Sequence, residues 1–199
     1  LFLYQKHSKM RIFNIPVLYL PYLVTPSPLR KKRKSGFLNP SLSFNFINTE
    51  TPQTIKLPYY FNIDIDKELT FTPIINYGGG TSSKQRMLFD YNQIISGGNF
   101  NFDISTDTTI NENNTSKWFS DASLIVDYDK NINETYNIKA NSALQTTQTY
   151  LRSSDPNNLY SSNTSLSSSI KLNGYGVLNN NDKLYVNTTT YQVVQANED

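Results

Sequence analysis

NIPVLYLPYLVTPSPLRKKRKSGFLNPSLSFNFINTETPQTIKLPYY, residues 14–60, is the stretch that decides the fold class of this chain. It begins apolar and aromatic, becomes strongly basic, and then alternates apolar with polar residues. Prolines interrupt it at Pro16, Pro21, Pro26, Pro28, Pro40 and Pro58. Because proline has no backbone N–H, it is confined to the edges, bulges and first residues of β-strands. The stretch therefore predicts weakly paired strands, one or two of them between Phe13 and Val24.

Alternation continues through the rest of the chain and predicts an all-β protein. One apolar face consists of Ile55, Leu57, Tyr59, Phe61 and Ile63. Similar runs follow at residues 42–46, 69–75, 87–91, 100–104, 122–128, 136–140, 165–175 and 183–194. Runs of about 9–11 residues with one apolar and one polar face are typical of transmembrane β-strands. A soluble β-sandwich also alternates, but the repeated polar faces and the aromatic strand ends favour a barrel.

Several short segments predict the connections between these strands. Gly97-Gly98, residues 129–131 and residues 179–182 predict turns, and the polar residues 142–164 predict a longer loop. The GGGTSSK segment at residues 78–84 is glycine-rich, but it lacks the spacing of a phosphate-binding loop. We therefore expect it to be a hairpin loop.

The composition limits the class of protein. Charged residues make up 17% of the chain, below the usual level of about 25%. The 11 Phe, 14 Tyr and one Trp argue against a disordered chain, because such chains are poor in aromatic residues. The longest apolar run, residues 12–25, is shorter than the roughly 20 residues of a membrane-spanning helix. Any membrane crossing is therefore expected to use strands.

Charge is divided unevenly along the chain. Residues 1–49 contain eight Lys and Arg and no acidic residue, whereas residues 50–199 contain ten Lys and Arg and sixteen acidic residues. The net charge of +2 is therefore +8 followed by −6. A basic segment suits an anionic partner, although a solvated connector without a ligand explains it equally well. Nothing around LRKKRK indicates a nucleic-acid-binding module.

Three sequence blocks occur in a fixed order: IPVLYLPYL at residues 15–23, KSGFLNPS at 34–41 and LPYYFNI at 57–63. Together they resemble the LptD family, the outer-membrane β-barrels that deliver lipopolysaccharide to the bacterial cell surface. Leu57 and Phe61 stand where the family often has Thr and Trp, and both keep an apolar or aromatic character. Beyond Ile63 the resemblance is one of pattern.

The resemblance implies a division of the chain. Residues 1–28 would be the last strands of a periplasmic β-jelly roll, and residues 29–39 a basic hinge. Residues 40–199 would be the first antiparallel strands of a large transmembrane β-barrel. The chain begins with Leu and shows no signal peptide, so we expect it to be an internal fragment of a longer protein in the cell outer membrane.

The resemblance also implies a function and its site. Lipopolysaccharide would leave through a lateral seam near the first barrel strands. Pro40 and Pro58 would thin the pairing there, since each removes a backbone donor. The alternative interpretation gives the two prolines no gating role: Pro40 would mark the start of a strand and Pro58 a bulge. Possible contacts to lipid phosphates are Arg30, Lys31, Lys32, Arg33 and Lys34. The expected protein partners are an LptE-type plug lipoprotein and an LptA-type periplasmic bridge protein.

Little in the sequence indicates catalysis. The chain has no Cys and a single His, and its carboxylates form no convincing acid–base pair. We therefore expect no catalytic residue, no metal site, no cofactor and no nucleic-acid partner. The alternative functions are an Asn/Ser/Thr-rich surface adhesin or other structural β-protein, and an unrelated porin-type barrel.

Overall fold

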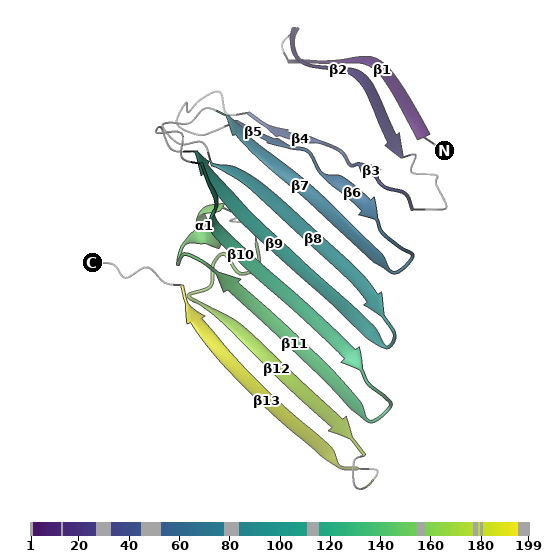
Figure 1. Ribbon diagram of the computed structural model, residues 1–199, viewed down its shortest axis with the longest axis vertical. Helices are drawn as coiled ribbons and strands as arrows, with labels where there is room; N and C mark the ends of the chain where they lie inside the picture. The colour runs from purple at the N-terminus through teal and green to yellow at the C-terminus, as the bar shows by residue number, and fades with distance from the viewer. Residues whose placement is uncertain are drawn as a thin grey trace, which may run out of the picture.

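The computed structural model describes residues 2–12, 14–26, 33–44, 53–77, 84–110, 116–154, 158–176, 179 and 181–194. These residues form two antiparallel β-sheets and one short helix (Figure 1). The predicted all-β fold is therefore confirmed. No helix among these residues is long and apolar enough to cross a membrane.

The first sheet is a hairpin of β1 (Phe2–Ile12) and β2 (Ile15–Pro26), drawn apart from the larger sheet in Figure 1. Pro16 and Pro21 lie within the single strand β2, which pairs on one side only, so a missing N–H can face away from the partner. One or two strands were predicted between Phe13 and Val24, and the structure has one there, β2; the bounds of β1 were not predicted.

The second sheet is an antiparallel meander with β13 at one edge and β3 and β4 at the other. Its strands are β3 (Gly36–Phe37), β4 (Ser41–Ser43), β5 (Gln53–Lys56), β6 (Tyr59–Asn62), β7 (Lys67–Tyr77), β8 (Gln85–Ile95), β9 (Gly98–Ile110), β10 (Ser116–Asn131), β11 (Tyr136–Gln145), β12 (Ser165–Tyr175) and β13 (Lys183–Val193). Among the described residues no ladder joins its two edges, so this part of the chain forms an open sheet and not a closed barrel.

The two faces of the second sheet differ in chemistry. One row of directly paired positions across β7 to β10 is apolar: Leu69, Tyr91, Phe102 and Val126. The adjacent row is polar: Glu68, Asn92, Asn101 and Asp127. Paired residues in a ladder point to the same face and neighbours along a strand to opposite faces. The sheet therefore has an apolar face and a polar face, as the alternation predicted.

The two ends of the second sheet also differ. Short connections, such as residues 63–66, 96–97 and 132–135, lie at one end, and residues 146–164 form a long connection at the other. Gly97 (φ +79°) permits one tight turn, because a Cβ there would lie 2.7 Å from the Asn131 carbonyl oxygen. Short turns at one end and longer loops at the other are typical of outer-membrane barrels.

The prediction of a turn at residues 129–131 was wrong. β10 continues to Asn131, and the turn is formed by residues 132–135. Asp129 stays in the ladder opposite Lys139, whose Nζ lies 2.8 Å from the Asp129 carboxylate, and Asn137 donates a 2.8 Å hydrogen bond to Asp129. Cross-strand partners thus outweigh the local turn preference of an Asp-Lys-Asn sequence.

The predicted loop at residues 142–164 is partly structured. β11 extends to Gln145, and helix α1 (Tyr150–Ser154) follows. Apolar side chains of α1 and the sheet form a buried cluster: Ile125, Ala143, Tyr150, Leu151, Leu166 and Val194. Ile125 and Ala143 belong to the polar face, so the segment folds over that face near the long-loop end.

Candidate functional site

The first strand of the second sheet consists of β3 and β4, the second strand consists of β5 and β6, and β7 is the third. The first strand is interrupted. β3 pairs with β6 and β4 pairs with β5, and the two short ladders are offset by one residue. Residues 38–40 therefore lie opposite residues 57–58, three against two. This is the arrangement of a β-bulge, in which one residue of the longer segment stays outside the ladder. The predicted prolines, Pro40 and Pro58, both lie within this interruption.

Pro58 weakens the contact with the first strand specifically. The Leu57 N–H donates to the Pro73 carbonyl oxygen of β7 at 3.2 Å, and the Leu38 N–H donates to the Pro58 carbonyl oxygen at 2.9 Å. Because successive residues of a strand bond to opposite neighbours, the Pro58 nitrogen faces Leu38 and offers no donor to it. The register of β5 and β6 on β7 is the same on both sides of the break.

Pro40 is exposed and is the last residue before β4. From the sequence, Pro40 was expected at the start of one strand and Pro58 within the next. In the structure both lie in the same interruption, where residues 38–40 face residues 57–58. The first strand is paired at only five positions, two in β3 and three in β4, compared with eleven between β8 and β9. The first strand is thus the least extensively paired strand of this sheet in the described part of the chain. Its role as a gate stays a prediction.

The basic segment before the first strand contacts the polar face. Arg33 Nη1 lies 2.7 Å from Glu68 Oε2 on β7, and the Tyr60 hydroxyl donates to the same oxygen at 2.8 Å. One residue before β3, Ser35 Oγ accepts a 2.9 Å hydrogen bond from the Asn62 backbone N–H. Of the predicted phosphate contacts, Arg30, Lys31 and Lys32 lie outside the described residues, and Lys34 is exposed.

Aromatic side chains gather on the apolar face at the short-turn end of the first two strands. The rings of Phe37 and Tyr59 meet edge to face at 4.9 Å, and those of Tyr59 and Phe61 lie 4.6 Å apart. Phe37 and Phe61 are exposed. Exposed aromatics near strand ends are typical of the girdle of an outer-membrane barrel.

A buried polar network lies near the opposite end, beneath α1. Arg86 Nε is 2.7 Å from the Asp107 carboxylate, and their side chains are 13% and 3% exposed. The Tyr150 hydroxyl bonds to Ser105 Oγ at 2.7 Å and donates to Asp107 at 3.2 Å. Burial raises the pKa of Tyr150 to about 12. This network was not predicted from the sequence, although alternation alone puts Arg86 and Asp107 on the polar face.

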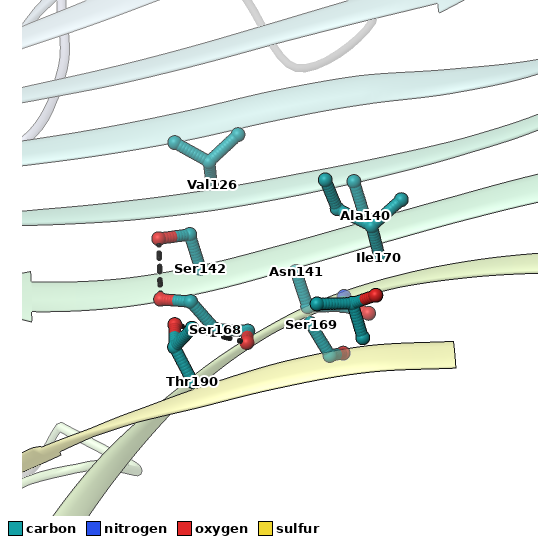
Figure 2. Close-up of a pocket in the computed structure, with 9 residues that line it drawn as sticks. Val126, Ala140, Asn141, Ser142, Ser168, Ser169, Ile170 and Thr190 are labelled. Atoms are coloured by element: carbon teal, nitrogen blue, oxygen red, sulfur yellow. Dashed lines mark hydrogen bonds between the residues drawn. The ribbon is translucent and has the colours of Figure 1, made fainter.

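A shallow hollow of about 270 Å³ lies on β10 to β13 (Figure 2). The β11–β12 ladder ends beside it, at Asn141 and Ser169. Just beyond, Ser142 and Ser168 bond through their hydroxyl groups at 2.8 Å. The hollow arises because small side chains line it: Ala140, Ser142, Ser168, Thr188 and Thr190 are among them.

Within the residues that the structure describes, no group of three or more His, Cys, Asp or Glu side chains could hold a metal ion. The single histidine, His7, lies in β1, where its Nδ1 is 2.5 Å from the Tyr19 hydroxyl oxygen.

Comparison with known proteins gives partial matches, and no protein-family profile matches the chain. The chain is 48% identical over 67 residues, 34% of its length, to LPS-assembly protein LptD of Shewanella frigidimarina. It is 35% identical over 97 residues to LptD of Shewanella denitrificans and 38% over 79 residues to LptD of Hahella chejuensis, 43% and 40% of its length. The matches cover 8%, 12% and 9% of these relatives, so the chain spans about a tenth of their length.

Proposed function

Because this chain is related to the LPS-assembly protein LptD family, we propose that it forms part of an outer-membrane protein that inserts lipopolysaccharide into the outer leaflet. The observation that carries the proposal is the pair of chemically distinct faces on one long antiparallel sheet. An apolar face suits the hydrocarbon core of a membrane, and a polar face suits a water-filled lumen. Sugars would pass along the polar face, and acyl chains would leave at the first strand.

The weakly paired first strand supports lateral exit. Parting two strands costs their ladder hydrogen bonds, each worth about 0.5–1.5 kcal/mol net, and the first strand has few. In the assembled barrel its free edge would meet a closing strand. A seam there would let a lipid move sideways without opening the ladders of β7 to β13, which have six to twelve paired positions each.

The proposal extends to partners and location. The polar face would contact an LptE-type plug lipoprotein. The β1–β2 hairpin would belong to a periplasmic jelly roll that receives lipopolysaccharide from an LptA-type bridge protein. A two-stranded sheet leaves both edges open for further pairing. The boundaries of residues 1–28, 29–39 and 40–199 stay predictions. The second sheet itself begins at Gly36.

Neighbouring residues of β9 test the assignment of the two faces. We expect Asn101→Cys in the complete membrane-inserted protein to react with a water-soluble thiol reagent entering the lumen. Phe102→Cys, carrying a fluorophore, should instead be quenched by a lipid-soluble quencher, because its side chain points to the opposite face. Equal lipid quenching at both positions, or quenching at residue 101 only, would contradict a membrane-facing apolar face.

Charge reversal tests the basic segment. Arg30→Glu, Lys31→Glu and Lys32→Glu together should slow lipopolysaccharide delivery, because they replace attraction to anionic phosphates with repulsion. These positions leave the Arg33–Glu68 pair intact. Surface labelling of newly made lipopolysaccharide measures the rate, with Arg30→Lys as the charge-preserving control. Unchanged delivery after three reversals would leave only the role of a solvated connector.

A further inference from the structure

The start of the first strand is fastened to the sheet by more than its ladder. Besides the two pairs of β3 there are the hydrogen bond from the Asn62 N–H to Ser35 Oγ and the ion pair of Arg33 with Glu68. Arg33 is only three residues before β3, and Glu68 lies on β7, beyond β6. The ion pair therefore passes across β6 and connects the residues just before β3 to β7.

Arg33 is placed to exchange its partner. Its side chain is 66% exposed, and only Nη1 contacts Glu68. A guanidinium has five N–H donors and binds phosphate oxygens in a bidentate manner. Lys34 adds a positive charge next to it.

Glu68 keeps a hydrogen bond when Arg33 leaves. The Tyr60 hydroxyl donates to Glu68 Oε2 at 2.8 Å, a hydrogen bond in which Arg33 is neither donor nor acceptor. Release of the arginine therefore leaves a carboxylate that is still hydrogen-bonded and partly hydrated, which avoids the cost of an unpaired buried charge. An exposed ion pair of this kind changes a conformational population by about fivefold or less, which suits a reversible contact.

We propose that Arg33 and Glu68 form a latch that a phosphate-bearing lipid opens: the phosphate takes Arg33 from Glu68 and releases the start of the first strand. This inference rests on the proposed function, because it makes the arriving lipid itself loosen the strand beside which it leaves. Arg33 is a positioning residue here, acting through the hinge.

Distances between spin labels at Asn39 and Asn99 in the complete protein test the latch. Without lipid, we expect one narrow distance distribution in the parent protein. Glu68→Gln should raise the displaced population about twofold to fivefold, and Arg33→Lys should not, since it keeps the charge. Asp129→Asn is the matched control, because it breaks the Lys139–Asp129 pair within the sheet. An increase with Asp129→Asn equal to that with Glu68→Gln would overturn the latch.

Adding different anions to the spin-labelled protein identifies which of them opens the latch. Purified lipopolysaccharide should raise the displaced population of the parent protein to that of Glu68→Gln and add nothing to Glu68→Gln. Inorganic phosphate should act at higher concentration, and chloride at equal ionic strength should not. Equal action of phosphate and chloride would reduce the effect to screening and overturn the latch. If lipopolysaccharide raises the displaced population and inorganic phosphate does not at any concentration, a phosphate group does not compete with Glu68 for Arg33, and the latch is overturned.

Surface delivery of lipopolysaccharide separates the latch from the proposed function. Lipid-dependent displacement together with normal delivery in Glu68→Gln supports the latch and removes the first strand from the export route. Unchanged distances in Glu68→Gln together with impaired delivery overturn the latch while leaving the export function in place.

Discussion

Replacing Pro40 and Pro58 with alanine should lower lipopolysaccharide delivery about tenfold while leaving the barrel at least as heat-resistant as before. Leu38 already donates to the Pro58 carbonyl oxygen, so the N–H of Pro58→Ala would face the Leu38 carbonyl oxygen and complete that pair. Each new bond contributes about 0.5–1.5 kcal/mol net. If the N–H of Pro40→Ala, at the bulge, also finds an acceptor on a neighbouring strand, the two bonds shift a gate balanced within a few kcal/mol by about tenfold or more.

Pro73→Ala is the matched control for this experiment. Pro73 accepts a hydrogen bond from Leu57, so a new donor there would strengthen the contact between the second and third strands and not that of the first. Surface labelling and thermal unfolding are measured on the same membranes. Normal delivery in the double variant, or a loss caused by misfolding, would remove the gate role from Pro40 and Pro58.

Removing the Asp107 carboxylate should release α1 from the polar face. Asp107→Ala leaves Arg86 mostly buried without its carboxylate and deprives the Tyr150 hydroxyl of an acceptor. Breaking a buried pair in this way costs about 3–5 kcal/mol. If local opening of the α1 segment carries that cost, its open population rises by a hundredfold or more, since each 1.36 kcal/mol is a factor of about ten.

Trypsin cleavage after Arg152 measures this opening, because Arg152 lies within α1 and cleavage follows the open population when reclosing is fast. Removing both charges, with Arg86→Met and Asp107→Leu, is the control: replacing a buried ion pair by apolar residues is often neutral or stabilising. Unchanged cleavage in Asp107→Ala would show that the ion pair does not hold α1 in place. A rise in the double variant also reflects loss of the hydrogen bond from Arg86 to the Ser154 carbonyl oxygen.

Alternation predicted most of the second sheet because its two faces have different chemistry. The run from Lys183 to Val194 corresponds almost residue for residue to β13, which ends at Val193. The turn between Ser96 and Gly98 was predictable from glycine. The end of β10 was not, because Asp129 and Asn131 are turn formers locally and strand residues only in the presence of β11.

The candidate site was predictable only in part. The resemblance indicated Pro40 and Pro58, but the one-residue offset that brings them together depends on how two strands pair, and no residue type specifies that. The contact of Arg33 with Glu68 joins residues 35 positions apart. Helix α1 is stabilised by packing on Ile125 and Ala143, two apolar residues of the polar face. These are tertiary effects that local sequence patterns do not carry.

Site-specific photocrosslinking tests our proposal that lipopolysaccharide leaves beside the first strand. A photoreactive residue at Leu42 in the complete protein would lie on the apolar face of β4, in register with Ile55. One at Val126 would lie on the same face of β10, far along the sheet. We predict strong crosslinking of lipopolysaccharide at Leu42 during active delivery and little at Val126. Equal crosslinking at both positions, or crosslinking at Val126 alone, would contradict exit at the first strand.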